Sequence, residues 1–321
     1  MMSGETQPRF LWWDGQTMPW QEATVHVTQM HWSAVSAIFE GIMSYWNDEE
    51  EELYVFRLDG HLQRFLRSQK LMRMRADYTE QQLTDAITGL LRANEHRSDT
   101  YVFPYAYPEG GARFRNFSSA AEPRPAQITI TTQASASHLL KRDLKSACIS
   151  TWTRISDNVM PPRIKNIANY RNGQLASSEA TINGYDMPIL LNTAGKVAEG
   201  AGACIMMVRE GKLVTPTGTD SILESITRGA IMTLAQDLGV EVVERPIDRT
   251  ELYIADEVFF CGTAAEITPV TSVDRYVIGD GDLGPVTTEI EQHFHDIVRG
   301  KDKRYASWVT PVGVAKAVSA D

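Results

Sequence analysis

Cysteine is scarce in this sequence, and its spacing excludes two common kinds of structural site. The chain of 321 residues has only three cysteines, Cys148, Cys204 and Cys261, and no C-x-x-C pair. An odd number of scattered cysteines argues against a disulfide framework and against a zinc site, and it is typical of reduced thiols in the cytoplasm. We therefore expect a cytoplasmic protein without a metal centre.

Long apolar runs and clusters of basic residues are also missing. No stretch of 18 residues lacks charged or strongly polar side chains, and the N-terminus has no basic segment followed by an apolar run. These absences predict that the chain neither spans a membrane nor carries an export signal. With 31 basic and 41 acidic residues, the formal charge is -10, so nucleic acid is not an expected partner.

Common catalytic motifs are absent or incomplete. Neither a G-x-S-x-G elbow nor a G-x-x-x-x-G-K-[ST] loop occurs. The stretch "GDGDLG" (279–284) matches G-x-G-x-x-G, but a dinucleotide fold needs a further strand and an acidic residue about 20 positions on, where Tyr305 stands. A turn followed by a helix beginning at Pro285 is the preferred interpretation. A dinucleotide-linked oxidoreductase is the alternative from a different class.

The first third of the chain alternates strand and helix patterns. Alternation predicts a strand over 24–29, and "LYVFRL" (53–58) is strand-like. A helix is predicted over 60–72, with Asp59 as its N-cap and Arg64 outside its apolar face, so periodicity alone makes Arg64 exposed. A second helix follows Thr79, whose spacing to Gln82 is that of a capping box.

The remaining patterns indicate two domains of the α+β class. Strands over 100–107 and 126–133 flank a loop rich in Gly, Pro and Ser. Further on, hairpins turn at Gly195 and at 210–211, and a helix ends at Gly239. This mixture does not form a regular βαβ repeat. We predict a small N-terminal domain over 1–133, a linker over 134–142 and a large domain over 143–321.

Lys165 lies in an unusual segment, "PPRIKNIANYRNG" (161–173). The first acidic residue C-terminal to it is Glu179, so no ion pair along the local sequence explains the lysine. An amine must be unprotonated to attack an aldehyde, and surroundings without acids favour the neutral form. Lys165 is therefore a candidate nucleophile.

Three distant stretches combine small residues with single polar groups. "AEGAG" places Glu199 where a flat ligand can approach the backbone closely. "SITR" (225–228) begins a helix whose N–H groups can hold a phosphate, and "GTAA" (262–265) offers a hydroxyl and further N–H groups. A tight turn is the alternative interpretation of each stretch taken alone.

Together, these stretches resemble the fold type IV pyridoxal-phosphate enzymes, most closely the branched-chain amino acid aminotransferases. The resemblance extends from "FLWWDGQTMPWQEATVHV" and "IFEGI" through "FRLDGHLQR" to "IADEVFFCGTAAEITPV" and "GPVT". It implies the two-domain α+β fold of D-amino acid aminotransferase, with a smaller N-terminal α/β domain and a larger C-terminal domain built on a mixed β-barrel-like core. It also implies pyridoxal 5'-phosphate as cofactor and a homodimer or a larger dimer-based assembly.

The resemblance assigns roles to individual residues. Lys165 matches the lysine that forms a Schiff base with the cofactor, Tyr170 the tyrosine beside its phenolic oxygen, and Glu199 the carboxylate that pairs with its pyridine nitrogen. The residues that match the phosphate site are Arg64, Ile226, Thr227 and Thr263. The implied reaction moves an amino group from a branched-chain L-amino acid to 2-oxoglutarate, with Lys165 as general base and then acid.

The substrate side departs from the family pattern. The family usually has Tyr-x-Arg where this chain has Tyr101, Val102 and Phe103, and it usually has tyrosine where this chain has Trp32, while Phe39 is retained. The substrate carboxylate is then left to the N–H groups of Thr263 and Ala264, or to Arg113 or Arg115 in the loop before 126. Two solvated loop arginines are the alternative interpretation.

The apolar replacements also raise a second candidate activity. Phe103 and Trp32 favour an (R)-selective amine transaminase on the same scaffold, in which a loop arginine would swing in for carboxylates and out for apolar amines. D-amino acid aminotransferase and aminodeoxychorismate lyase resemble the chain less, because "GTAAEITPV" and "IFEGI" differ from their patterns.

Overall fold

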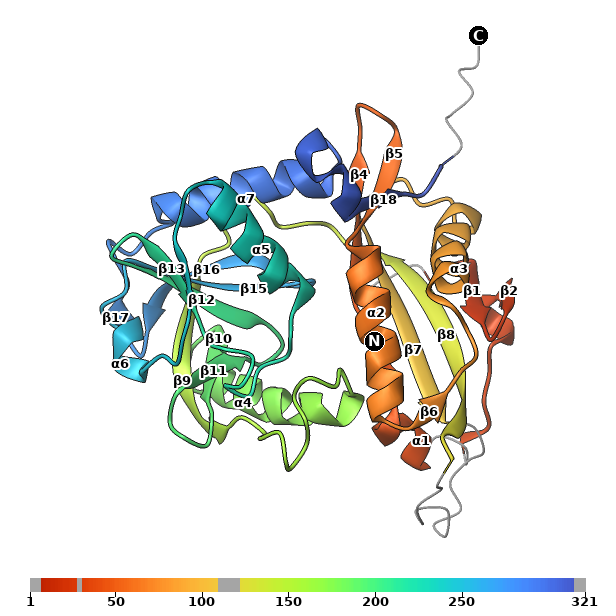
Figure 1. Cartoon of the computed structure of the whole chain (residues 1–321), viewed down its shortest axis with the longest axis horizontal. Coiled ribbons are helices and arrows are strands. Elements are labelled where there is room, and N and C mark those ends of the chain that lie inside the picture. Colours follow the sequence, from red (N-terminus) through yellow and green to blue (C-terminus); the bar gives the residue numbers. More distant parts are fainter. Residues whose placement is uncertain (1–6, 28–30, 109–121, 315–321) are drawn as a thin grey trace. The chain divides into compact units, whose positions relative to one another are not determined.

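The computed structural model describes residues 7–27, 31–108 and 122–314, and these form two compact units (Figure 1). Unit 1 comprises the described residues of 1–137, 165–168 and 297–321, and unit 2 comprises 138–164 and 169–296. The domain boundaries at 133 and 143 stay a prediction.

Unit 1 is built on one mixed sheet in the order β18-β5-β4-β7-β8-β1-β2. Its strands are β1 (Phe10–Trp13), β2 (Gln16–Pro19), β4 (Ile42–Asn47), β5 (Glu52–Phe56), β7 (Thr100–Pro108), β8 (Arg124–Ala134) and β18 (Val309–Pro311). Two short strands extend it: β3 (Ile38–Phe39) pairs with β7, and β6 (Met74–Arg75) pairs with β8. The strands predicted over 100–107 and 126–133 are thus confirmed. The strand predicted over 24–29 is wrong for residues 24–27, which lie outside every strand and are mostly exposed.

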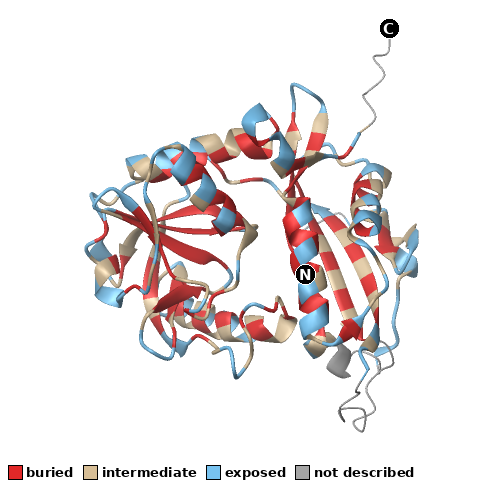
Figure 2. Cartoon of the chain, viewed as in Figure 1, coloured by how far each residue is buried: buried red, intermediate tan, exposed pale blue. Residues whose placement is uncertain are grey.

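The helices of unit 1 are α1 (His31–Ser36), α2 (Leu58–Leu71) and α3 (Glu80–Ala93), with 3-10 turns η1 (Trp20–Glu22) and η5 (Lys303–Trp308). Both long helices turn an apolar face to the unit's interior (Figure 2). Thr79 and Gln82 form the predicted capping box of α3. Asp59 as N-cap of α2 is wrong, because Arg57 takes a left-handed conformation (φ 45°) and the helix already begins at Leu58.

Unit 2 contains a closed six-stranded barrel. Its strands are β9 (Lys145–Thr153), β10 (Met187–Leu191), β11 (Val197–Gly200), β12 (Cys204–Arg209), β15 (Glu257–Gly262) and β16 (Glu266–Val273). The barrel closes because β11 pairs with β10 on one side and β12 on the other; β9 runs parallel to β10 and β16, and the remaining pairs are antiparallel. The predicted mixed barrel-like core is confirmed. Strands β13 (Lys212–Thr215), β14 (Val242–Glu244) and β17 (Tyr276–Val277) extend the sheet.

The helices of unit 2 surround this barrel. They are η4 (Ile167–Asn169) at the border of the unit, α4 (Tyr170–Ile182), α5 (Ile226–Asp237), α6 (Arg249–Leu252) and α7 (Pro285–Val298), whose last two residues belong to unit 1. The hairpin turns at Gly195 and at 210–211 are confirmed by positive φ values. Residues 279–284 form turns and bends before α7 begins at Pro285, so the preferred interpretation of "GDGDLG" is confirmed.

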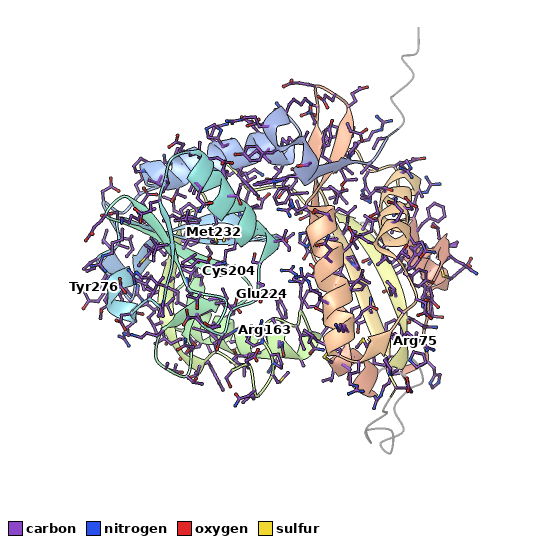
Figure 3. All side chains as sticks on the ribbon, in the orientation of Figure 1. Arg75, Arg163, Cys204, Glu224, Met232 and Tyr276 are labelled. Atoms are coloured by element: carbon purple, nitrogen blue, oxygen red, sulfur yellow. The ribbon has the colours of Figure 1, made fainter. Side chains whose placement is uncertain are left out.

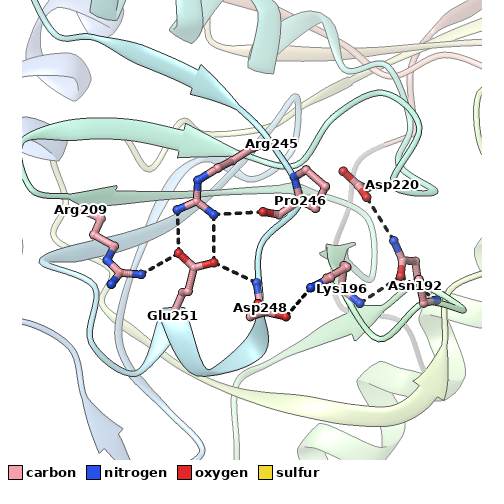
Figure 4. Close-up of polar contacts among 9 residues, drawn as sticks. Asn192, Lys196, Arg209, Asp220, Arg245, Pro246, Asp248 and Glu251 are labelled. Atoms are coloured by element: carbon pink, nitrogen blue, oxygen red, sulfur yellow. Dashed lines mark hydrogen bonds and ion pairs between the residues drawn. The ribbon is translucent and has the colours of Figure 1, made fainter.

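A polar network fixes the short helix α6 to the barrel (Figure 4). Glu251 accepts hydrogen bonds from Arg209 on β12 (2.6 Å) and from Arg245 (2.6 Å). The hydrogen bonds from Arg245 outweigh the opposing effect of burial and lower the pKa of Glu251 to about 2. Lys196, directly before β11, pairs with Asp248 at 2.6 Å. The network therefore holds the start of the strand that carries Glu199.

Candidate active site

Lys165 is held by the backbone of unit 1. Its carbonyl accepts a hydrogen bond from the N–H of Phe39 (3.0 Å), and its own N–H donates to Ser68 Oγ (3.4 Å). The next residue, Asn166, forms a bridge with Ile38 of β3. Lys165 is half-buried, and its Nζ lies 4.7 Å from the centroid of the Phe39 ring. The lysine thus stands over an aromatic ring on a fixed stretch of main chain.

Arg64 is part of a buried ion cluster on α2. Its Nε and Nη2 both lie 2.7 Å from the carboxylate of Glu40, which also contacts His61 Nδ1 at 2.8 Å. The exposure expected for Arg64 from periodicity is wrong, because only 6% of the residue is accessible. A buried carboxylate that pairs with a guanidinium and an imidazole can stabilise an arginine on the buried face of a helix.

Burial and charge oppose each other in this cluster. Burial alone would raise the pKa of Glu40, but the charge and hydrogen bonds of Arg64, together with His61, lower it to about 2. Burial lowers the pKa of His61, with Lys165 among the cations that act in the same direction. In this cluster, the carboxylate of Glu40 orients Arg64. The cluster also lies within electrostatic range of Lys165.

An aromatic row on β7 follows from strand alternation. Tyr101 and Phe103 share one face of the strand, while Val102 is buried on the other. The ring of Phe103 stacks on Phe39 with centroids 5.3 Å apart. Tyr101 packs over Gly41, where an added Cβ would lie 1.7 Å from the tyrosine hydroxyl. Unit 1 therefore brings Lys165 and the predicted substrate residues Phe39 and Phe103 together, with Tyr101 on the same face.

Three predicted substrate residues lack a described side chain. Trp32 lies in α1, whose first three side chains are not described. Arg113 and Arg115 fall outside the described residues. Their proposed roles stay predictions.

Glu199 lies on β11 and is 4% exposed. Its Oε1 accepts hydrogen bonds from Nε and Nη2 of Arg154, both at 2.7 Å. Its Oε2 accepts from the N–H of Leu223 at 3.1 Å, and the thiol of Cys204, labelled in Figure 3, lies 4.0 Å away. Arg154, directly after β9, is a residue of the candidate site that sequence reasoning missed, since a lone arginine at a strand end carries no motif.

Small residues allow the loop after β11 to pack closely on α4, which begins at Tyr170. A Cβ added at Gly202 would lie 3.6 Å from Cε1 of the Tyr170 ring. At Gly173, one turn further along the helix, a Cβ would lie 2.1 Å from the carbonyl oxygen of Ala201. Because Ala201 and Gly202 directly follow β11, close packing of helix and loop places Tyr170 near the strand of Glu199.

Two groups of N–H donors complete this part of unit 2. Ser225 caps α5, and its Oγ accepts from the N–H of Arg228, the third residue of the helix. In the described part of the chain, no hydrogen bond uses the N–H of Ile226 or Thr227. Such donors at a helix N-terminus form an anion site.

The second group is the turn between β15 and β16. Thr263 and Ala264 occupy it, half-buried and exposed respectively. Among the described residues, neither backbone N–H has a hydrogen-bond partner. Gly262, directly before the turn, packs closely on Ala203, since a Cβ added there would lie 3.6 Å from the Cα of Ala203. Unit 2 thus brings Tyr170, Glu199 and the two donor groups onto neighbouring elements.

Metal ligands and membrane segments give no competing site. Within residues 7–27, 31–108 and 122–314, no three His, Cys, Asp or Glu side chains are placed to hold a metal ion. No helix in the same ranges is long and apolar enough to cross a bilayer.

Comparisons with known proteins show the family of the chain. The model of the family amino-transferase class IV matches residues 37–273. A probable branched-chain-amino-acid aminotransferase of Aquifex aeolicus is 40% identical, covering 94% of this chain and 96% of that protein. The branched-chain amino acid aminotransferase of Thermobaculum terrenum, solved in its PLP-form, has a TM-score of 0.92 and 48% identity, covering 96% of this chain and 99% of that chain.

A third relative is solved with an amino acid. The branched-chain aminotransferase of the thermophilic archaeon Thermoproteus uzoniensis, solved with norvaline, has a TM-score of 0.88 and 39% identity, covering 95% of this chain and 99% of that chain. These similarities extend over nearly the whole chain and include both units. The chain belongs to class IV of the aminotransferases.

Proposed function

We propose that this aminotransferase moves the amino group of a branched-chain L-amino acid to 2-oxoglutarate, with pyridoxal phosphate bound at Lys165. The observation that carries the proposal is the similarity to branched-chain aminotransferases over 96% of the chain, with 48% identity to one solved in its PLP-form. The (R)-selective amine transaminase is not favoured, because the relatives described above are all branched-chain enzymes.

The residues present fit this cofactor. A flat, anionic pyridine derivative needs a buried carboxylate for its ring nitrogen, small residues against its face and N–H donors for its phosphate. Unit 2 offers Glu199, the glycine and alanine residues after it, and the N–H groups of Ile226 and Thr227. Pyridoxal phosphate supplies an aldehyde that binds amines and a ring that accepts electrons from the substrate's α-carbon.

The protein's own groups have distinct tasks. Lys165 would provide the amine that binds the cofactor, and its free amine would move a proton from the substrate's Cα to the cofactor, acting as general base and then as general acid. Glu199, held in charged form by Arg154 opposite it, stabilises a protonated ring nitrogen. Tyr170 donates to the phenolic oxygen, and Arg64 and Thr263 add to the phosphate site.

The substrate side combines an apolar wall with a carboxylate site. Phe39 and Phe103 present stacked rings beside Lys165, which suits a branched aliphatic side chain. Tyr101 extends the same face. We propose that the N–H groups of Thr263 and Ala264 hold the substrate carboxylate, with Arg113 or Arg115 as an additional cation and Trp32 near the substrate side chain.

The test measures each half of the reaction. Purified enzyme should be yellow, and borohydride should attach the cofactor's mass to the peptide that contains Lys165. L-leucine and L-glutamate should each change the absorbance spectrum of the bound cofactor by converting it to its amino form, whereas (R)-1-phenylethylamine and D-alanine should not. Conversion by (R)-1-phenylethylamine without conversion by L-leucine would replace the proposal with the amine transaminase, and colourless protein that takes up no cofactor would refute both.

We also propose a homodimer, or a larger assembly of dimers, in the cytoplasm. The resemblance to branched-chain aminotransferases supports the dimer, and the three cysteines, which form no disulfide, support a reducing compartment. Sedimentation of the purified enzyme would measure the assembly directly.

A further inference from the structure

His138 contacts the turn of residues 263–265 and the residue after it through both nitrogens of its ring. Its Nδ1 lies 2.9 Å from the carboxylate of Glu266, and its Nε2 lies 2.8 Å from the carbonyl oxygen of Ala265. Its backbone N–H donates to the same Glu266 carboxylate at 2.7 Å. A carboxylate and a carbonyl are both acceptors, while a neutral imidazole has only one N–H. While Glu266 is ionised, both bonds therefore form only when His138 is an imidazolium.

The charges around His138 favour this form. The hydrogen bond to Glu266 raises the pKa of His138, burial opposes it, and the carboxylate of Asp143 adds to the rise. Glu291 of α7 accepts the N–H of Leu140 at 2.8 Å and is electrostatically coupled to His138. The carboxylates that act on this ring thus supply the negative charge that an imidazolium needs.

The turn itself is strained where His138 holds it. Glu266 has φ 43°, in the left-handed region that favours glycine, and it is 2% exposed. Such a conformation costs about 1 kcal/mol or more and persists where the surroundings enforce it. The carbonyl of Ala265 is also fixed, since it accepts from Thr268 Oγ at 2.6 Å as well as from His138. The imidazolium thus ties both the last peptide of the turn and the strained residue after it.

We propose that protonated His138 is a positioning residue, which holds the turn so that the N–H groups of Thr263 and Ala264 bind the substrate carboxylate. This inference rests on the proposed function, because the carboxylate site is part of it. The imidazolium also adds a positive charge next to Glu266, and so makes the local potential more favourable for a bound anion. When His138 loses its proton, one hydrogen bond to the turn is lost and the local charge becomes more negative. Both changes weaken carboxylate binding.

The protonation state can be measured without activity. In histidine labelled with 15N, both ring nitrogens of His138 should show imidazolium shifts below a titration midpoint that lies above the ordinary pKa of 6.5. Glu266→Gln should move that midpoint down toward the ordinary value. A titration midpoint at or below 6.5, or a midpoint that Glu266→Gln does not change, would overturn the proposal even if a His138 variant failed to fold.

The positioning role is tested by binding of 4-methylvalerate, which is leucine without its amino group and therefore cannot react, to the cofactor-loaded enzyme from pH 6 to 9. His138→Gln should bind it about five- to tenfold more weakly at pH 6, as expected for loss of one charge-assisted hydrogen bond. The variant should also lack the fall in affinity that accompanies deprotonation of His138 in the wild type. His293→Gln, at a partly exposed position of α7, is the matched control and should keep the wild-type affinity and pH profile.

The results separate the two proposals. Wild-type affinity and pH dependence in His138→Gln would overturn the positioning role while leaving amino transfer from L-leucine intact. Absence of amino transfer in the wild type would refute the proposed function, whereas the 15N titration would still report on the contact between His138 and the turn.

Discussion

At the scale of single residues, local sequence marks candidates for chemistry but does not report burial that depends on distant partners. Lys165 stands out by its acid-free surroundings, and Glu199 by the small residues beside it. The burial of Arg64 was not predicted, because it depends on Glu40, which lies 24 positions earlier in the sequence. Arg154 was missed for the same reason, since its partner Glu199 is 45 positions away. A local pattern reports the properties of neighbours along the chain, and these pairs are neighbours only in space.

The Glu40 cluster leads to a prediction about pH. Glu40→Gln should destabilise unit 1 by about 3 kcal/mol at pH 7, because it leaves the buried guanidinium of Arg64 without its counter-charge. The folded pKa of Glu40 is about 2 against an ordinary 4.5, so its stabilisation is complete above pH 4.5 and is lost as the pH falls toward 2. Urea denaturation from pH 7 to about pH 2.5 should therefore show the difference from wild type shrinking.

A matched control lies on α2, the helix that carries Arg64. Asp59→Asn removes the pair between Arg57 and Asp59, in which the aspartate side chain is 50% exposed. Exposed pairs contribute about 0–1 kcal/mol, so this variant should stay close to wild type. An equal loss for Glu40→Gln at both ends of the pH range would show that its effect does not arise from charge.

At the scale of helices and strands, the elements with local signals were predicted well. The capping box at Thr79 and the hairpin turn at 210–211 depend on residues only a few positions apart. The prediction of Asp59 as the N-cap of α2 was wrong, because Arg57 takes a left-handed conformation and no glycine or asparagine at that position indicates it. The strand over 24–29 was wrong over 24–27 because alternation alone supplies no pairing partner.

A prediction at this scale concerns the contact between α4 and the loop after β11. Gly173→Ala would place a methyl group 2.1 Å from the carbonyl oxygen of Ala201, and neither backbone can give way cheaply. We expect a loss of about 2 kcal/mol, within the range for overpacked cores. A lower melting temperature and weaker cofactor binding should appear together, because Tyr170 lies one turn earlier on the same helix.

Gly229 in α5 provides the comparison. A Cβ there meets nothing within 4 Å, so Gly229→Ala should stabilise the enzyme by up to about 1 kcal/mol through helix propensity. If Gly173→Ala melted at or above the wild-type temperature, the close approach of α4 to Ala201 would be refuted.

At the scale of the whole molecule, local sequence patterns could not predict that the barrel closes or which segments belong to each unit. The mixed barrel-like core was expected from the family resemblance and is confirmed. That β18 near the end of the chain pairs with β5 of unit 1 has no counterpart in local sequence. The paired residues, such as Val309 and Phe56, lie far apart along the chain, and periodicity does not encode contacts of that separation.

The C-terminal strand gives a prediction at this scale. Truncation after Trp308 should remove the pairing of Val309–Pro311 with β5 and expose its edge. Loss of two or three ladder hydrogen bonds, each worth about 1 kcal/mol, should speed amide hydrogen exchange in β5 at least about tenfold. Truncation after Val314 keeps β18 and should leave that exchange unchanged. Equal exchange rates in both truncated proteins would contradict a stabilising role for β18.

The short segment 165–168 limits how the two units can be exchanged between homologous enzymes by recombination. Its residues pack with unit 1, through the bridge to Ile38, although the chain on either side of it belongs to unit 2. A recombination event that exchanged one unit for a homologue's would therefore separate Lys165 either from its covalent neighbours or from the scaffold that holds it. Chimeras that swap both units together with this segment should retain the lysine's setting, so we expect the two units to behave in evolution as one indivisible module.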